Sequence, residues 1–220
     1  MMKMIADDVC PSVIFLGEAI VEPKEIVRYF GTRSDKECNV MYNASMMVLL
    51  WNSLATKDVR LMERSLSIDY GVPDDGVWIN YARCHDDIGW GLDYSLLASW
   101  GQREVDHKRF LNDYFLGWAP GSSSRGALYN ADPVTGDARF CGTTASMCGI
   151  EAAGFEGDAA KMDVAIAQDL MLHAYMLTQS GLPIIYSGDE VAQVNDYSYV
   201  EDPERADDSR YIHRGRFPWE

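Results

Sequence analysis

The sequence predicts an α/β fold built around a parallel sheet, and the pattern of its segments is the reason. Short runs of β-branched and aromatic residues alternate with longer amphipathic segments. Parallel strands need a crossover between them, usually a helix, and this alternation supplies one. Four such strands are expected, half the number in a (β/α)8 barrel. A flavodoxin-like sheet would fit the same alternation, but we find no glycine-rich phosphate-binding loop of the kind that fold predicts.

The first three predicted elements form a βαβ unit. A β-branched and aromatic run predicts a strand over 13–16. A helix over 24–30 follows, opened by Pro23 and stopped by Gly31. A second short strand is expected at 39–42.

The middle of the chain continues the pattern and then departs from it. Apolar residues at helical spacing predict one long helix over 45–69, and a third strand is expected at 77–82. The stretch 88–157 is rich in Gly, Ser, Asp and aromatic residues. A loop of this length in a compact domain is usually a functional excursion with short helices of its own.

The last two predicted elements return to the βα pattern. An amphipathic helix is expected over 158–180, with Gly181 at its C′ position and Pro183 beyond it. A strand over 182–186 follows, and the remaining tail is polar and loop-like.

Composition and charge exclude two classes of partner. The formal net charge of −15 argues against nucleic acid, whose phosphates are bound by clusters of Lys and Arg. No apolar run approaches the ~20 residues of a membrane span, and the first eight residues carry acid where a signal peptide would be apolar. Five cysteines without paired or zinc-type spacing indicate reduced thiols, so we expect a cytoplasmic protein with no metal and no cofactor.

Glu18 is a candidate general acid because it directly follows the first predicted strand. Gly17 before it leaves space for a ligand to approach closely. A glycosidase acid needs a carboxyl group in a partly apolar site, where its pKa rises toward neutrality. The alternative is a solvated Glu at the entry to the helix that Pro23 opens.

His85-Asp86-Asp87 follows the third predicted strand and precedes a turn at Gly89 and Trp90, where we expect the Trp to be exposed. Acidic groups beside an aromatic residue at the carboxyl end of a strand are typical of sugar-cleaving barrels. Asp86 could stabilise an oxocarbenium-like transition state, His85 could bind a sugar hydroxyl, and Asp87 could contact a neighbouring ring. The alternatives are an Asx turn, or two metal ligands without a visible third.

Four other residues have weaker claims to a site. Asp189 and Glu190 follow the last predicted strand, and would either cap a helix or bind a ligand. His173 lies in mid-helix among apolar residues, so we expect a core or interface role. Cys84 has no base and orienting group that would make it a nucleophile.

The segments Gly17–Val21, Tyr81–Trp90, Gly181–Glu190 and Asp207–Arg210 together resemble the α-amylase superfamily, glycoside hydrolase family 13. The greatest similarity is to its amylosucrase and sucrose hydrolase branch, and it extends from about Val9 to Trp219. The resemblance implies the second half, strands 5–8, of a TIM (β/α)8 barrel, with a mostly helical B′ insertion after strand 7.

On this resemblance the chain divides into three regions. Residues 1–87 hold barrel strands 5–7 with their helices, and 88–157 form the B′-like insertion. Residues 158–220 hold barrel helix 7, strand 8 and the loop that follows.

The resemblance also implies roles for the candidate site residues. Glu18 would be the general acid/base and Asp86 the transition-state stabiliser. The nucleophile of this family ends strand 4 within an Arg-x-Asp-Ala motif, which does not occur here, and Asp7 and Asp8 would lie on the helix after it. A retaining mechanism needs that carboxylate about 5 Å from the acid/base. We therefore expect the chain to be inactive alone and to need the remaining half of the barrel.

Substrate contacts are implied in the same way. His85 would bind the glucosyl unit, Asp87 and Arg139 would meet the fructosyl or acceptor ring, and Arg210 would close the glucosyl pocket through a salt bridge. One departure concerns the acceptor subsite, where Lys108 stands at the position of an arginine, which puts glucan binding in doubt.

These observations favour part of the catalytic domain of a sucrose-acting retaining α-glucosyltransferase or hydrolase, with an α-glucan or another sugar as acceptor. An α-glucosidase or sucrose phosphorylase-like protein of the same superfamily is the alternative within this class. A non-catalytic carbohydrate-binding or complementation module is the alternative outside it.

Overall fold

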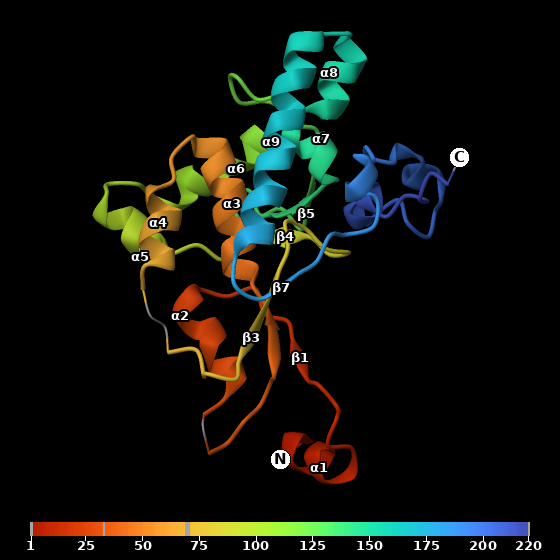
Figure 1. The fold of residues 1–220 in the computed structure, drawn as a ribbon. Helices are drawn as coiled ribbons and strands as arrows, with labels where there is room; N and C mark the ends of the chain where they lie inside the picture. The colour runs from red at the N-terminus through yellow and green to blue at the C-terminus, as the bar shows by residue number, and fades with distance from the viewer. Residues whose placement is uncertain (1, 33, 69–70, 220) are drawn as a thin grey trace.

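The computed structural model describes residues 2–32, 34–68 and 71–219. Its central element is a four-stranded sheet in which all neighbouring strands are parallel (Figure 1). The strands lie side by side in chain order: β1 (Leu16–Gly17), β2 (Val40–Tyr42), β3 (Val77–Asn80) and β7 (Leu182–Pro183). The predicted α/β fold with a parallel sheet is confirmed, and the strand order is the one that consecutive strands of a barrel have.

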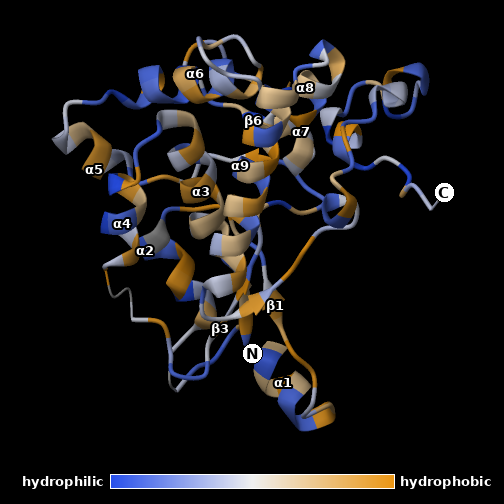
Figure 2. Ribbon diagram, turned by 45° about the horizontal axis from the view of Figure 1, so that its top comes forward, coloured by the Kyte–Doolittle hydropathy of each residue, from blue (hydrophilic) through white to orange (hydrophobic). Residues whose placement is uncertain are grey.

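The two outer strands are shorter than predicted. At β1, the Asn39 side chain binds the Phe15 N–H, so the regular ladder begins only at Leu16. At β7, the last hydrogen bond to β3 runs from the Ile184 N–H to the carbonyl of Asn80, where β3 itself ends. Within the described residues each outer strand pairs with one neighbour, so this sheet has two open edges. One of these edges is β1, which is coloured as hydrophobic in Figure 2.

Several helices accompany this sheet. They are α1 (Met2–Val9), α2 (Pro23–Ile26) with the 3-10 helix η1 (Val27–Phe30), α3 (Ala44–Thr56), α4 (Arg60–Leu66) and α9 (Ala159–Thr178). The prediction of one helix over 45–69 is wrong. Lys57 adopts a left-handed conformation (φ 56°) that ends α3. Helix α4 then begins after Val59, and the Asp58 carboxylate accepts the N–H of its first residue, Arg60.

Helix α3 lies at the centre of the fold, and nearly all of its side chains are buried. The Asn43 side chain caps its first turn by accepting the Met46 N–H. Trp51 is fully buried, and its Nε1 donates to the carbonyl of Ala82 at 2.7 Å. This contact ties α3 to the segment that leads from β3 to the candidate site.

The stretch 88–157 contains both helices and a second sheet. Its helices are α5 (Tyr94–Ser99), α6 (Glu104–Phe115), α7 (Thr144–Cys148) and α8 (Ile150–Glu156). Its antiparallel sheet, which the sequence analysis did not predict, has the order β4 (Ile88–Gly89), β6 (Arg139–Cys141), β5 (Ala127–Tyr129).

The expectation of an exposed Trp90 is wrong, because the residue belongs to the core. Its ring stacks on Phe115 at 5.6 Å, and its Nε1 donates to the Asn112 side chain. One continuous apolar cluster contains Trp51 of α3, Trp90, Phe115 and Phe140 of the insertion, and Met176 of α9. The insertion therefore shares its core with the helices of the parallel sheet.

Gly181 does not occupy the predicted C′ position. Helix α9 ends at Thr178, and the next residue, Gln179, is extended. Gly181 has φ 131°, and a Cβ there would lie 2.4 Å from the carbonyl oxygen of Trp78. Glycine is needed here because the chain passes close to the backbone of β3 as β7 begins.

The polar tail after β7 is folded into short 3-10 helices. These are η2 (Asp189–Val191), η3 (Tyr197–Glu201) and η4 (Ser209–His213), and η4 packs on β5 and β6 of the insertion. Among the described residues, no helix combines the length and apolar character that a membrane crossing requires.

Candidate active site

Glu18 directly follows β1, and its side chain is exposed. A Cβ at Gly17 would lie 2.2 Å from the Sδ of Met41 on β2. Close packing between neighbouring strands is therefore one reason for a glycine here, and access for a ligand stays a prediction.

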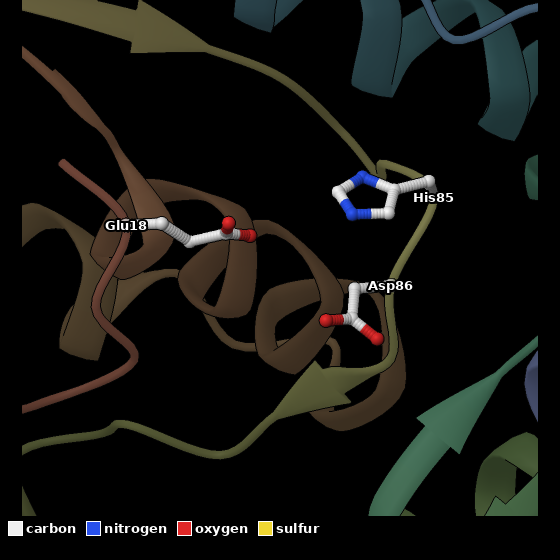
Figure 3. Close-up of side chains that lie close together, drawn as sticks. All are labelled: Glu18, His85 and Asp86. Carbon is white, nitrogen blue, oxygen red and sulfur yellow. The ribbon is translucent and has the colours of Figure 1, made fainter. Parts of the chain in front are cut away.

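His85 and Asp86 lie in the loop after β3 and meet Glu18. One ligand atom from each of the three side chains lies within 4.8 Å of the others. Figure 3 shows the three side chains converging from two segments that are far apart in the sequence. They meet because β1 and β3 are parallel members of one sheet, so their carboxyl ends lie at the same edge.

Basic groups from the C-terminal tail bind Asp86. The Nη1 of Arg210 lies 2.9 Å from Asp86 Oδ1, while its Nε and Nη2 bind the Asp208 carboxylate at 2.8 Å each. The Nη2 of Arg214 lies 3.7 Å from the same Asp86 oxygen. Burial by itself would raise the pKa of Asp86, but the hydrogen bonds from the Arg210 guanidinium and the Asp87 N–H, together with the charge of Arg210, outweigh it, and the pKa of Asp86 is lowered. Asp86 is therefore held in its ionised form.

Asp87 is in the opposite electrostatic situation. Burial and the neighbouring Asp86 carboxylate raise the pKa of Asp87, while the charge of Arg139 opposes this rise. Arg139 belongs to β6, where it pairs with Gly89, and a Cβ at Gly89 would lie 2.0 Å from its Nη1. Gly89 thus leaves room for the guanidinium group beside the acids. Adjacent carboxyl groups with divergent pKa values suit different chemical roles.

The structure places Asp189 in a buried ion pair that the sequence analysis missed. Arg83 Nε lies 2.8 Å from Asp189 Oδ1, and both side chains are 2% exposed. Neither predicted role of Asp189 fits, because η2 has no side-chain cap and the carboxylate faces Arg83. His173 lies 3.9 Å from the second Asp189 oxygen, consistent with the expected core role. No spacing in the sequence links Arg83 to Asp189, since the pair depends on the fold.

Lys108 is engaged inside the insertion. Its Nζ lies 2.8 Å from Glu104 and 3.1 Å from Asp137. Its neighbour Arg109 donates to the carbonyl of Pro133 at 3.0 Å. The contacts found for both basic side chains are therefore within the insertion.

His85 and Asp86 are two possible metal ligands for which the sequence offers no third, and in the structure Glu18 lies close enough to be the third. Among the described residues, these three side chains form the single group of His, Cys, Asp or Glu that is compact enough to hold an ion. Arg210 already neutralises Asp86, however, and a cation would have to compete with it. The absence of a metal role stays a prediction.

Comparison with known proteins relates the chain to sugar phosphorylases. It is 22% identical over 206 residues to glucosylglycerate phosphorylase of Escherichia coli (strain K12), an alignment that covers 91% of this chain and 33% of that protein. It is structurally similar to sucrose 6F-phosphate phosphorylase from Thermoanaerobacter thermosaccharolyticum, with a TM-score of 0.65 and 14% identity over 98% of this chain and 37% of that one. No protein-family model matches the sequence.

The chain thus spans about a third of the length of these two proteins. The sequence match is weak homology to a phosphorylase, and the structural match supports an α/β fold with a parallel sheet.

Proposed function

We propose that this chain carries the acid/base and charge-stabilising part of a retaining site that takes sucrose as its glucosyl donor. The observation that carries the proposal is the convergence of Glu18, His85 and Asp86, whose ligand atoms lie within 4.8 Å of one another. Glu18 is exposed at the end of β1, whereas Asp86 is partly buried and kept ionised beside Arg210. A glycosidase needs two carboxyl groups in different roles, and we assign proton transfer to Glu18 and charge stabilisation to Asp86. The partly apolar surroundings that the acid requires would come from a strand that pairs with β1.

The proposed reaction is a double displacement in which Glu18 transfers the proton. As a nucleophilic carboxylate from the remaining half of the barrel bonds to the anomeric carbon, the bond between that carbon and the glycosidic oxygen breaks, and Glu18 protonates the leaving oxygen. The Asp86 carboxylate stabilises the positive charge that develops on the ring, and His85 binds a ring hydroxyl. In the second step Glu18 accepts a proton from the acceptor, which attacks the glucosyl-enzyme and restores the α-configuration.

Three further residues would bind the substrate. Asp87 and Arg139 would meet the fructosyl or acceptor ring, since they lie beside the acids on the insertion side. Arg210 would close the glucosyl pocket through its ion pairs, which restricts the site to the end of a substrate.

The nucleophilic carboxylate would come from the remaining half of the barrel. The two open sheet edges support this part of the proposal. Apolar side chains are exposed on both, with Leu16 at 47% on β1 and Leu182 at 54% on β7. Exposed apolar edge strands are unusual in native folds, because their unpaired backbone groups can bind another strand. A second set of four strands would cover both.

The acceptor separates two candidate functions. The resemblance of the motifs favours an amylosucrase-like protein that transfers glucose to an α-glucan, another sugar or water. The similarity to two sugar phosphorylases favours phosphate as the acceptor. Both would act in the cytoplasm, in keeping with five free cysteines.

Complementation tests the proposal. We expect sucrose cleavage when the chain is combined with an N-terminal half-barrel that carries the Arg-x-Asp-Ala motif, and no cleavage by either part alone. Glu18→Gln should abolish the restored activity. Glu22→Gln is the matched control, because the Glu22 carboxylate pairs with Lys24 instead of meeting Asp86.

The products decide the acceptor. Glucan or free glucose would support the amylosucrase-like function, and glucose 1-phosphate formed only with phosphate present would support the phosphorylase. If the assembled barrel binds sugar and Glu18→Gln leaves cleavage unchanged, Glu18 is not the acid and the proposed mechanism is wrong.

A further inference from the structure

His213 lies at the end of η4, in the polar tail, and is 4% exposed. Both of its ring nitrogens contact backbone from distant segments. Its Nδ1 lies 3.1 Å from the backbone nitrogen of Gly142, and its Nε2 lies 3.2 Å from the carbonyl oxygen of His85. A single buried ring thus joins the tail, the insertion and the candidate site.

These two partners fix the proton on the ring. The Gly142 N–H can only donate, so Nδ1 must be unprotonated and accept. The His85 carbonyl can only accept, so Nε2 must carry the hydrogen. The ring is therefore neutral with its proton on Nε2, and a positive ring would lose the bond from Gly142.

The charged surroundings agree with a neutral ring. The groups that face it are Arg83 from the segment after β3, Arg214 from its own tail, and Asp86 from the site loop. Burial, followed by the charge of Arg83, lowers the pKa of His213 to about 4, against smaller opposing effects of the hydrogen bond to the His85 carbonyl and of the charge of Asp86.

The bond to His85 acts on the peptide that connects two site residues. The carbonyl of His85 precedes Asp86, and it accepts from Arg214 Nε at 2.7 Å as well as from His213. Two donors from the tail therefore fix the plane of this peptide, and with it the directions in which the two site side chains leave the backbone. Gly142 directly follows β6, the strand that carries Arg139.

The geometry points to His213 as a positioning residue that orients His85 and Asp86 by donating from Nε2 to the His85 carbonyl, and that aligns them with the insertion through Gly142. The hydrogen bonds can be tested on this chain alone. Their effect on turnover rests on the proposed function.

The tautomer is the first test, measured on the 15N-labelled chain by long-range 1H–15N NMR of its four histidine rings, with His213 assigned through the Gln variant. At pH 7 we expect a neutral His213 ring with the proton on Nε2. A proton on Nδ1, or a charged ring at that pH, would overturn the assignment.

Two substitutions separate the two hydrogen bonds. The amide nitrogen of a glutamine reaches about as far as Nε2, so His213→Gln retains a donor for the His85 carbonyl. The amide of an asparagine reaches only as far as Nδ1, so His213→Asn retains an acceptor for Gly142 and loses the donor. His107→Gln is a control for replacing a buried histidine, because that ring binds Asn52 in another part of the core.

We expect the His85 ring signals to keep their wild-type shifts in His213→Gln and to move in His213→Asn. In the complemented enzyme, kcat should fall by about 10- to 100-fold in His213→Asn, with a smaller change in KM, and should be largely retained in His213→Gln. Equal losses in the two variants, or no loss in either, would contradict positioning through the His85 carbonyl. If complementation restores no activity at all, the proposed function fails, while the ring signals still decide the role of His213.

Discussion

The two acids of the candidate site are supported to very different degrees. Glu18 stands at the end of the outer strand β1, and among the described residues its side chain has no hydrogen-bond or ion-pair partner. Asp86 is bound by Arg210 and approached by Arg214, its N–H contacts the Cys84 sulfur, and its preceding carbonyl is held by two donors.

The difference follows from where each acid leaves the sheet. Asp86 follows β3, which has a neighbouring strand on both sides, and the insertion and tail fold back around its loop. Glu18 follows β1, which has a neighbour on one side only. Asp86 is therefore held in place by contacts within this chain, whereas Glu18 would be surrounded only when a strand pairs with β1.

The largest expected effect on stability comes from the buried ion pair of Arg83 and Asp189, beneath the loop that carries Asp86. Asp189→Asn should lower the free energy of unfolding by about 3–5 kcal/mol, because it leaves the buried Arg83 charge without its counter-ion. Urea denaturation followed by circular dichroism would measure the change. Glu190→Gln is the control, since its exposed side chain keeps an acceptor for the Gly188 N–H. A loss below about 1 kcal/mol would show that water or another group compensates Arg83.

A smaller effect is expected from the ion pair at Asp86. In Arg210→Ala the pKa of Asp86 should rise, because burial remains and the guanidinium is gone. The carboxyl 13C signal of Asp86, followed through a pH titration, would measure this. Arg205→Ala, which removes an exposed pair with Asp202, should leave that signal unchanged.

The ion pair between Arg210 and Asp86 also predicts how the stability lost in Arg210→Ala depends on pH. The pKa of Asp86 is lower in the folded chain than in the unfolded chain, so the ion pair stabilises the fold above the unfolded value, and this is lost as the pH falls through the folded value. The difference in stability between wild type and Arg210→Ala should therefore be about 1 kcal/mol or less near neutrality and should shrink below pH ~4, since the pair is partly exposed. A difference that grows in acid would contradict the pairing.

The smallest effect is expected at the unsupported acid. Glu18→Gln should change the free energy of unfolding by less than about 0.5 kcal/mol, because an exposed side chain without partners contributes little. Thermal unfolding of the isolated chain would measure it. A clear destabilisation would mean that Glu18 is held by contacts as Asp86 is, and the contrast between the two acids would disappear.

The parallel sheet could be predicted from the sequence because its strands are short apolar runs separated by helical ones, and local patterns of this kind survive in the fold. The residues at which the helices and strands begin and end could not be predicted. The helix predicted over 45–69 is broken at Lys57, since a left-handed residue has no apolar signature in the sequence. Trp90 looked exposed beside Gly89, but the aromatic residues that bury it come from α6 and β6.

The candidate site was predicted only in its local parts. Glu18 directly follows β1 and the His85–Asp87 segment lies in the loop after β3, so strand order is enough to bring them to one edge. Arg83, Asp189 and His213 were not recognised as a supporting network, because their partners lie 71 to 130 residues away along the chain. Polar residues that far apart in the sequence produce no periodic pattern from which their pairing could be predicted.

The shared aromatic core has a consequence for how this fold could change in evolution. Trp51 of α3 packs against Phe115 of the insertion, and Phe115 in turn packs against Trp90 and Phe140. Arg139 and the rest of the insertion therefore depend on the same packing as the helices of the parallel sheet. We expect a core substitution in the insertion to change the cooperativity with which the whole chain unfolds, and the insertion could not be replaced by that of another protein without repacking α3.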